Sequence, residues 1–120
     1  MSYPQLGERV AAERARARWA RQTGNHGRAR VCARRAAGWA LGGWPTSQTE
    51  FQEGKASNAY QTLRSAAADD ALPLPVRLAA ARLTARVDQA FSLPFDQDLV
   101  EDALDIIRWR WPGWQPLHGE

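Results

Sequence analysis

The 120-residue chain holds a single cysteine and two histidines. One cysteine, Cys32, excludes a disulfide within the chain. Cys32, His26 and His118 together are too few for a zinc site of ordinary ligand spacing. The sequence therefore predicts neither a disulfide within the chain nor a zinc site.

Long apolar runs are also missing. The first ten residues, MSYPQLGERV, lack the apolar segment of a secretory signal. No stretch approaches the roughly 20 apolar residues that a membrane-spanning helix needs. We therefore expect a cytoplasmic protein without a membrane partner.

β-branched residues are scarce and alanine dominates the apolar class. Alanine loses no side-chain entropy in a helix, whereas Val, Ile and Thr favour strands. The sequence predicts an all-α fold, an up-and-down antiparallel bundle of four to five helices. At this length we expect one domain, residues 1–111, followed by an extended C-terminal tail, residues 112–120.

Periodicity and end signals place five helices. Gly24, Gly42 and Pro112 are breakers that end three of them, and Asn25 can cap the second. The longest irregular stretch is expected at residues 42–55. The expected helices span residues 5–22, 27–41, 56–68, 75–91 and 97–111.

The first expected helix carries two apolar strips. Leu6, Val10 and Ala17 share one side, while Ala12, Ala15 and Trp19 lie opposite. Two strips indicate contact with two neighbours, or with a partner chain. The second expected helix carries one stripe of small residues that ends in a large ring. Small residues let another helix approach closely, so we expect a close neighbour on this side. The stripe consists of Ala29, Cys32, Ala33, Ala36, Trp39 and Ala40.

The last expected helix is acidic at its start and basic at its end, which complements the helix dipole. Asp96 is the expected N-cap, with Phe95 and Val100 as a hydrophobic staple. Three aspartates at i, i+4 and i+7 share a face that we expect to be solvated: Asp98, Asp102 and Asp105.

Tryptophan is abundant near the C-terminus. Trp111 falls on the buried side of the last helix and Trp109 on the other side. Exposed tryptophan is typical of interfaces, so Trp19, Trp109 and Trp114 are candidate interface residues. The alternative is that the tail folds back and buries all three C-terminal rings.

Charge is unevenly distributed. From Arg9 to Arg35 there are nine arginines against one acid, Glu13, and from Asp88 to Arg110 six acids against two arginines. The basic half could bind an external anion such as RNA or DNA, or it could face the acidic half within the chain or across a dimer. For the first alternative the candidate residues are Arg14, Arg18, Arg21, Arg28, Arg30 and Arg34.

Catalytic motifs find little support. Arg21 and His26 have the Arg-x4-His spacing of certain ribonucleases, yet Gly24 places a helix end between them. His26 is expected to begin the second helix as an exposed residue. Cys32 lies on the packing stripe and is expected to be a core residue. We predict no catalytic residue, no cofactor and no metal.

Gly24-Asn25 with Ala29, Ala33 and Ala36 resembles the middle of a tetratricopeptide repeat, with Ala17 and Ala20 in the preceding helix. The match covers about 25 residues and occurs once. A large ring usually stands where Ala33 is, and no second repeat follows. This resemblance implies a single helical hairpin.

Over residues 5–111 the chain also resembles HEPN-type domains, which are small helical bundles. The matching features are Ala36-Ala37-Gly38-Trp39-Ala40-Leu41 and the acidic amphipathic helix 98–111. The resemblance implies homodimerisation, and in some members nucleotide binding or RNA cleavage. RNA-cutting members place Arg-x4-6-His near the last long helices, but residues 57–111 contain no histidine.

The sequence thus favours a non-catalytic helical interaction protein that forms a homodimer or binds another protein. Binding of RNA, DNA or a nucleotide through the arginine-rich first two helices is the alternative. A HEPN-type ribonuclease ranks third.

Overall fold

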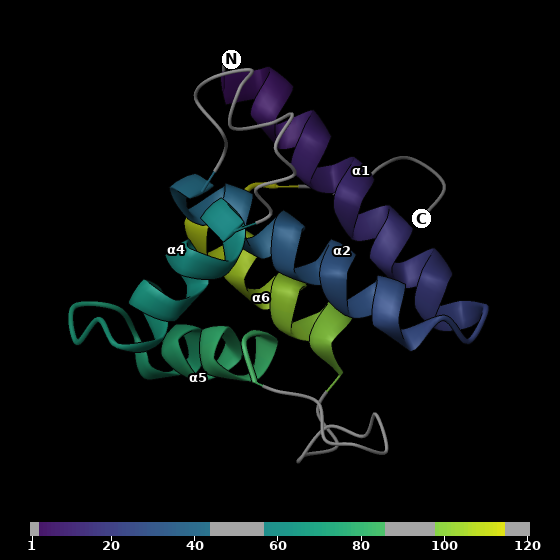
Figure 1. Cartoon of the computed structure of the whole chain (residues 1–120). Helices are drawn as coiled ribbons and strands as arrows, with labels where there is room; N and C mark the ends of the chain where they lie inside the picture. The colour runs from purple at the N-terminus through teal and green to yellow at the C-terminus, as the bar shows by residue number, and fades with distance from the viewer. Residues whose placement is uncertain (1–2, 44–56, 86–97, 115–120) are drawn as a thin grey trace.

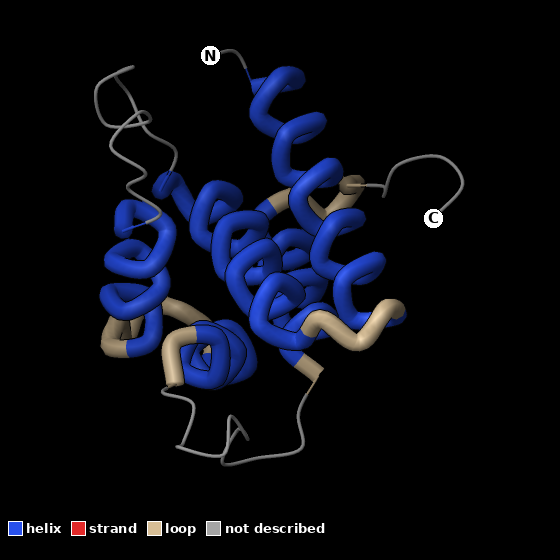
Figure 2. The backbone as a smooth tube through the Cα atoms, turned by 45° about the vertical axis from the view of Figure 1, so that its right-hand side comes forward, coloured by secondary structure: helices blue, strands red, loops and turns tan. Residues whose placement is uncertain are grey.

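The structure is a computed structural model that describes residues 3–43, 57–85 and 98–114. Every regular element in these ranges is a helix, as Figure 2 shows, and the expected all-α bundle is confirmed. None of the described helices is long and apolar enough to cross a membrane. The helices are α1 (Tyr3–Gln22), α2 (His26–Gly38), the short π-type turn η1 (Trp39–Gly43), α4 (Ser57–Ala67), α5 (Leu74–Leu83) and α6 (Leu99–Arg110).

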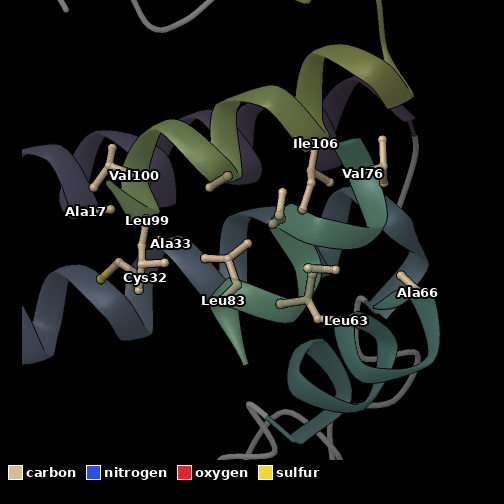
Figure 3. Close-up of a cluster of buried hydrophobic side chains, with 14 residues drawn as sticks. Ala17, Cys32, Ala33, Leu63, Ala66, Val76, Leu83, Leu99, Val100 and Ile106 are labelled. Carbon is tan, nitrogen blue, oxygen red and sulfur yellow. The ribbon is translucent and has the colours of Figure 1, made fainter. Parts of the chain in front are cut away.

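α6 is largely enclosed by other described helices. It packs on α2 and on α5, and most of its side chains are buried. Ile106 of α6 shares the largest apolar cluster with Leu63 of α4 and Leu83 of α5 (Figure 3). Cys32 and Ala33 bring α2 into the same cluster. A second cluster joins α1, α2, η1 and the C-terminal end of α6 through Val10, Ala36, Ala40, Ile107 and the following Trp111.

α1 and α2 form the predicted hairpin, in which α1 lies at the edge of the described bundle and α2 between α1 and the other helices (Figure 1). Gly24, with φ +85°, adopts the left-handed conformation that ends α1. Asn25 then caps α2, since its side chain accepts a hydrogen bond from the backbone N–H of Arg28 at 3.1 Å. Both predictions for this turn are confirmed.

α2 and α4 cross closely at Gly38. A Cβ atom on Gly38 would lie 2.5 Å from the Cβ of Ala59, well inside van der Waals contact. The predicted stripe of small residues lies on another side of α2 and has α1 as its near neighbour, since Ala33 clusters with Ala17 and Ala36 with Val10. α2 then continues into η1, where Gly42 with φ 104° ends the helical path, as expected for Gly42. The π-type turn was not predicted.

The prediction for the fourth helix is wrong at its C-terminal end. α5 stops at Leu83, although the apolar pattern continues to Phe91. The Thr84 hydroxyl donates to the carbonyls of Ala80 and Ala81, a side-chain bond that competes with helix continuation. Arg34 of α2 also donates to the carbonyl oxygens of Leu83 and Ala85. Residues 86–97 lie outside the described part of the chain.

The predicted N-cap of the last helix is also wrong. Asp98, and not Asp96, caps α6, because its Oδ1 accepts the backbone N–H of Val100 at 2.9 Å. An aspartate must stand directly before the first helical residue to reach the free N–H groups. Asp96 and the proposed staple residue Phe95 lie outside the described residues.

Candidate interaction surface

The inner side of α1 is mostly apolar and faces the bundle. Val10 and Ala17 are fully buried, and Leu6 packs on the second cluster, so the first predicted strip is confirmed. α1 packs mainly on α2, with smaller contacts to α6 and η1. Its opposite side has no described helix against it (Figure 1).

Residues on that opposite side form what we call the outer face of α1. At about 100° per residue, Glu8, Ala12, Ala15 and Trp19 fall along one line opposite Val10 and Ala17. Ala12 and Ala15 are half-buried, while Trp19 is 68% exposed. Three arginines border the line and complete the outer face: Arg9, Arg16 and Arg18.

A buried carboxylate supports one border of this face. Glu13 is only 3% exposed and lies on the α2 side of α1. Arg16 donates to Glu13 Oε2 at 3.0 Å, and Nη1 of Arg35 lies 3.7 Å from Oε1. One negative charge thus holds two guanidinium groups, whose remaining N–H groups stay accessible because both side chains are substantially exposed.

Three of the six arginines proposed for anion binding are engaged in the fold. Arg14 is buried, and Arg21 pairs with Asp98 across the α1–α6 contact. Arg34 binds the C-terminal carbonyls of α5 and lies over the Tyr60 ring. Burial and the neighbouring charge of Arg30 lower the pKa of Arg34.

The remaining three candidates do not gather into one exposed patch. Arg28 is exposed at the start of α2, whereas Arg18 and Arg30 are half-buried on different helices. The structure therefore brings together few of the arginines that the nucleic-acid alternative needs.

The expectation of a solvated three-aspartate face is wrong for Asp102, which is completely buried. Arg82 of α5 holds it with two parallel hydrogen bonds, each 2.9 Å. These hydrogen bonds raise the pKa of Arg82. The position follows from the helix period, since Asp102 lies three residues after Leu99 and four before Ile106, on the buried side.

α6 exposes a narrow strip to solvent. Glu101, Asp105 and Trp109 follow one another at four-residue spacing and are all exposed, and Arg108 and Arg110 are exposed beside them, so the exposed residues of α6 carry charges of both signs. Trp109 is 40% exposed and Trp111 buried, as the helix period predicts. Trp114 is half-buried against the second cluster. Of the three predicted interface tryptophans, Trp19 is thus the most exposed.

Trp109 also borders a cleft of about 330 Å³. Its lining mixes apolar, hydroxyl and charged groups: Leu41, Thr62, Ser65, Ala66, Asp69, Leu72, Trp109 and Arg110. Asp69 uses one carboxylate oxygen to cap the backbone N–H of Ala71 at 2.9 Å. The cleft contains no pair of side chains arranged as a nucleophile and its base.

The candidate catalytic residues are apart from one another. His26 is exposed at the start of α2, as expected, and Cys32 is buried in the main cluster. Burial and a hydrogen bond to Glu13 raise the pKa of the Cys32 thiol to about 11, which disfavours the reactive thiolate. Within the described ranges, no three His, Cys, Asp or Glu residues are placed to hold a metal ion.

Compared with protein-family models, curated protein sequences and solved structures, the chain matches none of them. The functional proposals below therefore rest on the residues and their geometry.

Sequence reasoning missed the buried ionic groups. Asp102 was expected on a solvated face and the burial of Glu13 was not predicted, although each falls at helical spacing from residues of an apolar stripe. Glu13 follows Val10 by three residues and precedes Ala17 by four. The position of Glu13 relative to these two apolar residues could therefore have predicted its burial. Arg82, which neutralises Asp102, and Arg35, the second partner of Glu13, come from other helices, which the sequence does not reveal.

Proposed function

We propose that this protein is a non-catalytic interaction module that associates into a homodimer through the outer face of α1. The observation that supports this most directly is the 68% exposure of Trp19. An indole ring left in water forgoes a large gain from burial, and Trp and Arg are the residues most enriched at the energetic centres of interfaces.

The surroundings of Trp19 support the same proposal. Ala12 and Ala15 precede it on the same line and present little bulk, so another helix can approach closely. Arg16 is held in place by Glu13 before any partner binds. Ordering a long side chain costs about 0.5–1.5 kcal/mol on association, and this cost is reduced when the side chain is already held.

Binding of RNA or DNA has less support. Counterion release requires several arginines that reach phosphates together. Arg14, Arg21 and Arg34 are already engaged with groups of the chain itself. A HEPN-type ribonuclease has the least support of the three. Within the described structure, His26 has no catalytic neighbour, and the one such neighbour of Cys32 is Glu13.

Replacement of Trp19 by serine tests the proposed function. We expect the wild-type chain to be dimeric in sedimentation velocity at micromolar concentrations and Trp19→Ser to dissociate at least about tenfold more readily. The melting temperature should change little when each is measured as a monomer, because Trp19 packs on little of its own chain.

Leu78→Ser is the matched control. Leu78 is a large apolar residue of α5 with 47% exposure, and it lies away from α1. Its replacement should leave the dimer intact. A wild-type chain that stays monomeric up to about 100 µM, or a dimer that Leu78→Ser disrupts and Trp19→Ser does not, contradicts the proposal.

A further inference from the structure

The cleft that Trp109 borders lies between the ends of three elements of the described structure. Leu41 comes from η1, Trp109 and Arg110 come from the last turn of α6, and the other lining residues come from α4 and the turn after it. Thr62 and Ala66 stand four residues apart, so α4 presents one side to the cleft. The volume of about 330 Å³ is near the lower limit of ordinary ligand pockets, which suits a small molecule.

The turn between α4 and α5, which forms one wall of this cleft, is held by its own hydrogen bonds. Asp69 Oδ1 accepts the backbone N–H of Ala71 at 2.9 Å, and the Asp69 carbonyl accepts the N–H of Leu72 at 3.0 Å. Arg77 donates to the Leu72 carbonyl at 3.1 Å, and its Nη1 lies 3.5 Å from Asp70 Oδ1. The wall is therefore ordered before any ligand binds, which lowers the entropic cost of binding.

Among the eight residues that line the cleft, Asp69 and Arg110 are the two that carry a charge. They do not pair with each other. One oxygen of Asp69 caps Ala71, and the Arg110 guanidinium lies over the Trp111 ring, 5.9 Å from its centroid. The negative end of the α4 dipole lies near Asp69 and adds to its attraction for a cation. Arginine in turn binds carboxylates well, so the cleft offers one group for each sign of charge.

The rest of the lining suits an apolar group. Trp109 is 40% exposed, and a ligand group that stacks on its ring removes part of that area from water. Leu41 and Leu72 extend the apolar surface. Thr62 and Ser65 add hydroxyl groups that can donate or accept hydrogen bonds.

We propose that this cleft binds a small zwitterion, namely a free α-amino acid with an aromatic or branched apolar side chain. Asp69 receives its ammonium group, Arg110 receives its carboxylate, and the side chain packs on Trp109. The inference goes beyond the proposed function, because none of the residues that line the cleft belongs to α1.

The two charged groups select a zwitterion over a simple amine or acid. A ligand with a single charge pairs with Asp69 or with Arg110, but not with both. The other group then loses water without gaining a partner, which costs binding free energy. A zwitterion of amino-acid size carries both charges at one end and leaves its side chain for the apolar part of the cleft.

Chemical-shift titration of the full isotope-labelled chain tests the proposal, with L-phenylalanine as the probe. Phenethylamine lacks the carboxylate of this probe and hydrocinnamate lacks its ammonium group. We expect L-phenylalanine to shift the backbone amide signals of Ser65, Asp69 and Arg110. Each analogue should bind at least about tenfold more weakly, since it forgoes one charged hydrogen-bonding group.

Two variants assign the charges to their partners. Asp69→Asn keeps a side-chain oxygen for the Ala71 cap and removes the charge, so it should weaken L-phenylalanine at least about tenfold without weakening hydrocinnamate. Arg110→Gln should weaken L-phenylalanine similarly without weakening phenethylamine. Arg108→Gln is the matched control, since Arg108 is exposed on the same helix but does not line the cleft. It should bind all three compounds as wild type does.

Circular dichroism and thermal unfolding check that each variant folds. The inference is overturned if L-phenylalanine shifts no signal of the cleft at up to about 10 mM. It is also overturned if either analogue binds as tightly as L-phenylalanine, or if folded Asp69→Asn and Arg110→Gln bind it no more weakly than Arg108→Gln does.

Discussion

Buried ionic residues determine much of the internal arrangement at the residue scale. Arg82 reaches from α5 to the fully buried carboxylate of Asp102 and binds both of its oxygens. A carboxylate in the core is tolerated only when its charge and hydrogen bonds are compensated. This pair therefore joins α5 to the buried side of α6.

Arg82→Met should destabilise the protein by about 3–5 kcal/mol, because it removes the two parallel hydrogen bonds and the positive charge that Arg82 gives to a buried carboxylate. The double variant Arg82→Met with Asp102→Leu should recover most of that loss, since it removes the buried charge as well. Urea unfolding monitored by circular dichroism measures both. Equal losses in the single and double variants would show that the charge of Asp102 is not what Arg82 compensates.

Cys32 should make stability fall at alkaline pH. Its pKa rises from 9.0 to about 11 on folding because burial and Glu13 disfavour the thiolate. The native state thus holds its proton more tightly than the unfolded state. The stabilisation is fully present below pH 9 and is lost as the pH rises towards about 11.

Comparison with Cys32→Ala isolates this effect from other groups that titrate in the same range. Urea unfolding between pH 8 and about 11 should show a steeper decline for wild type than for Cys32→Ala. The native thiol should also react slowly with iodoacetamide at neutral pH. Parallel pH profiles, or rapid alkylation of the folded chain, would contradict the assignment.

At the element scale, the sequence predicted which segments form helices, but it predicted where those helices end only in part. The turn at Gly24 and Asn25 was predictable because glycine conformation and side-chain capping are local effects. The end of α5 was not, because Arg34 from a distant part of the sequence binds its last carbonyl groups. The N-cap of α6 was misplaced because two aspartates stand near the helix start.

The close crossing of α2 and α4 gives a test at this scale. Gly38→Ala should destabilise the protein by about 1–3 kcal/mol, since the new Cβ would lie 2.5 Å from the Cβ of Ala59 and force the helices apart. Thermal unfolding measures the change.

Gly27→Ala is the matched control in the same helix. A Cβ at Gly27 meets nothing within 4 Å, and alanine is the better helix former. It should therefore leave stability unchanged or raise it by up to about 1 kcal/mol. If Gly38→Ala is as well tolerated as Gly27→Ala, the crossing is looser than the structure shows.

At the scale of the whole molecule, the basic and acidic halves of the sequence are only partly matched inside one chain. Arg21 with Asp98 is an internal match of the kind that the charge pattern suggested. Other charges stay on the surface, among them Arg9 and Arg16 on the outer face of α1 and Glu101, Asp105 and Arg108 on α6. The proposed dimer rests on the exposed Trp19, which lies beside the arginines of α1.

The sequence by itself determined the helical class, the hairpin of α1 and α2, and the burial of Cys32 and Trp111, since these follow from composition and helix period. Only the tertiary structure decided which charges are internal. Arg14, Arg34 and Asp102 are drawn into the fold, whereas Trp19 stays outside. The helix period predicts which residues lie on the same side of a helix, but the packing of the helices determines which groups that side contacts.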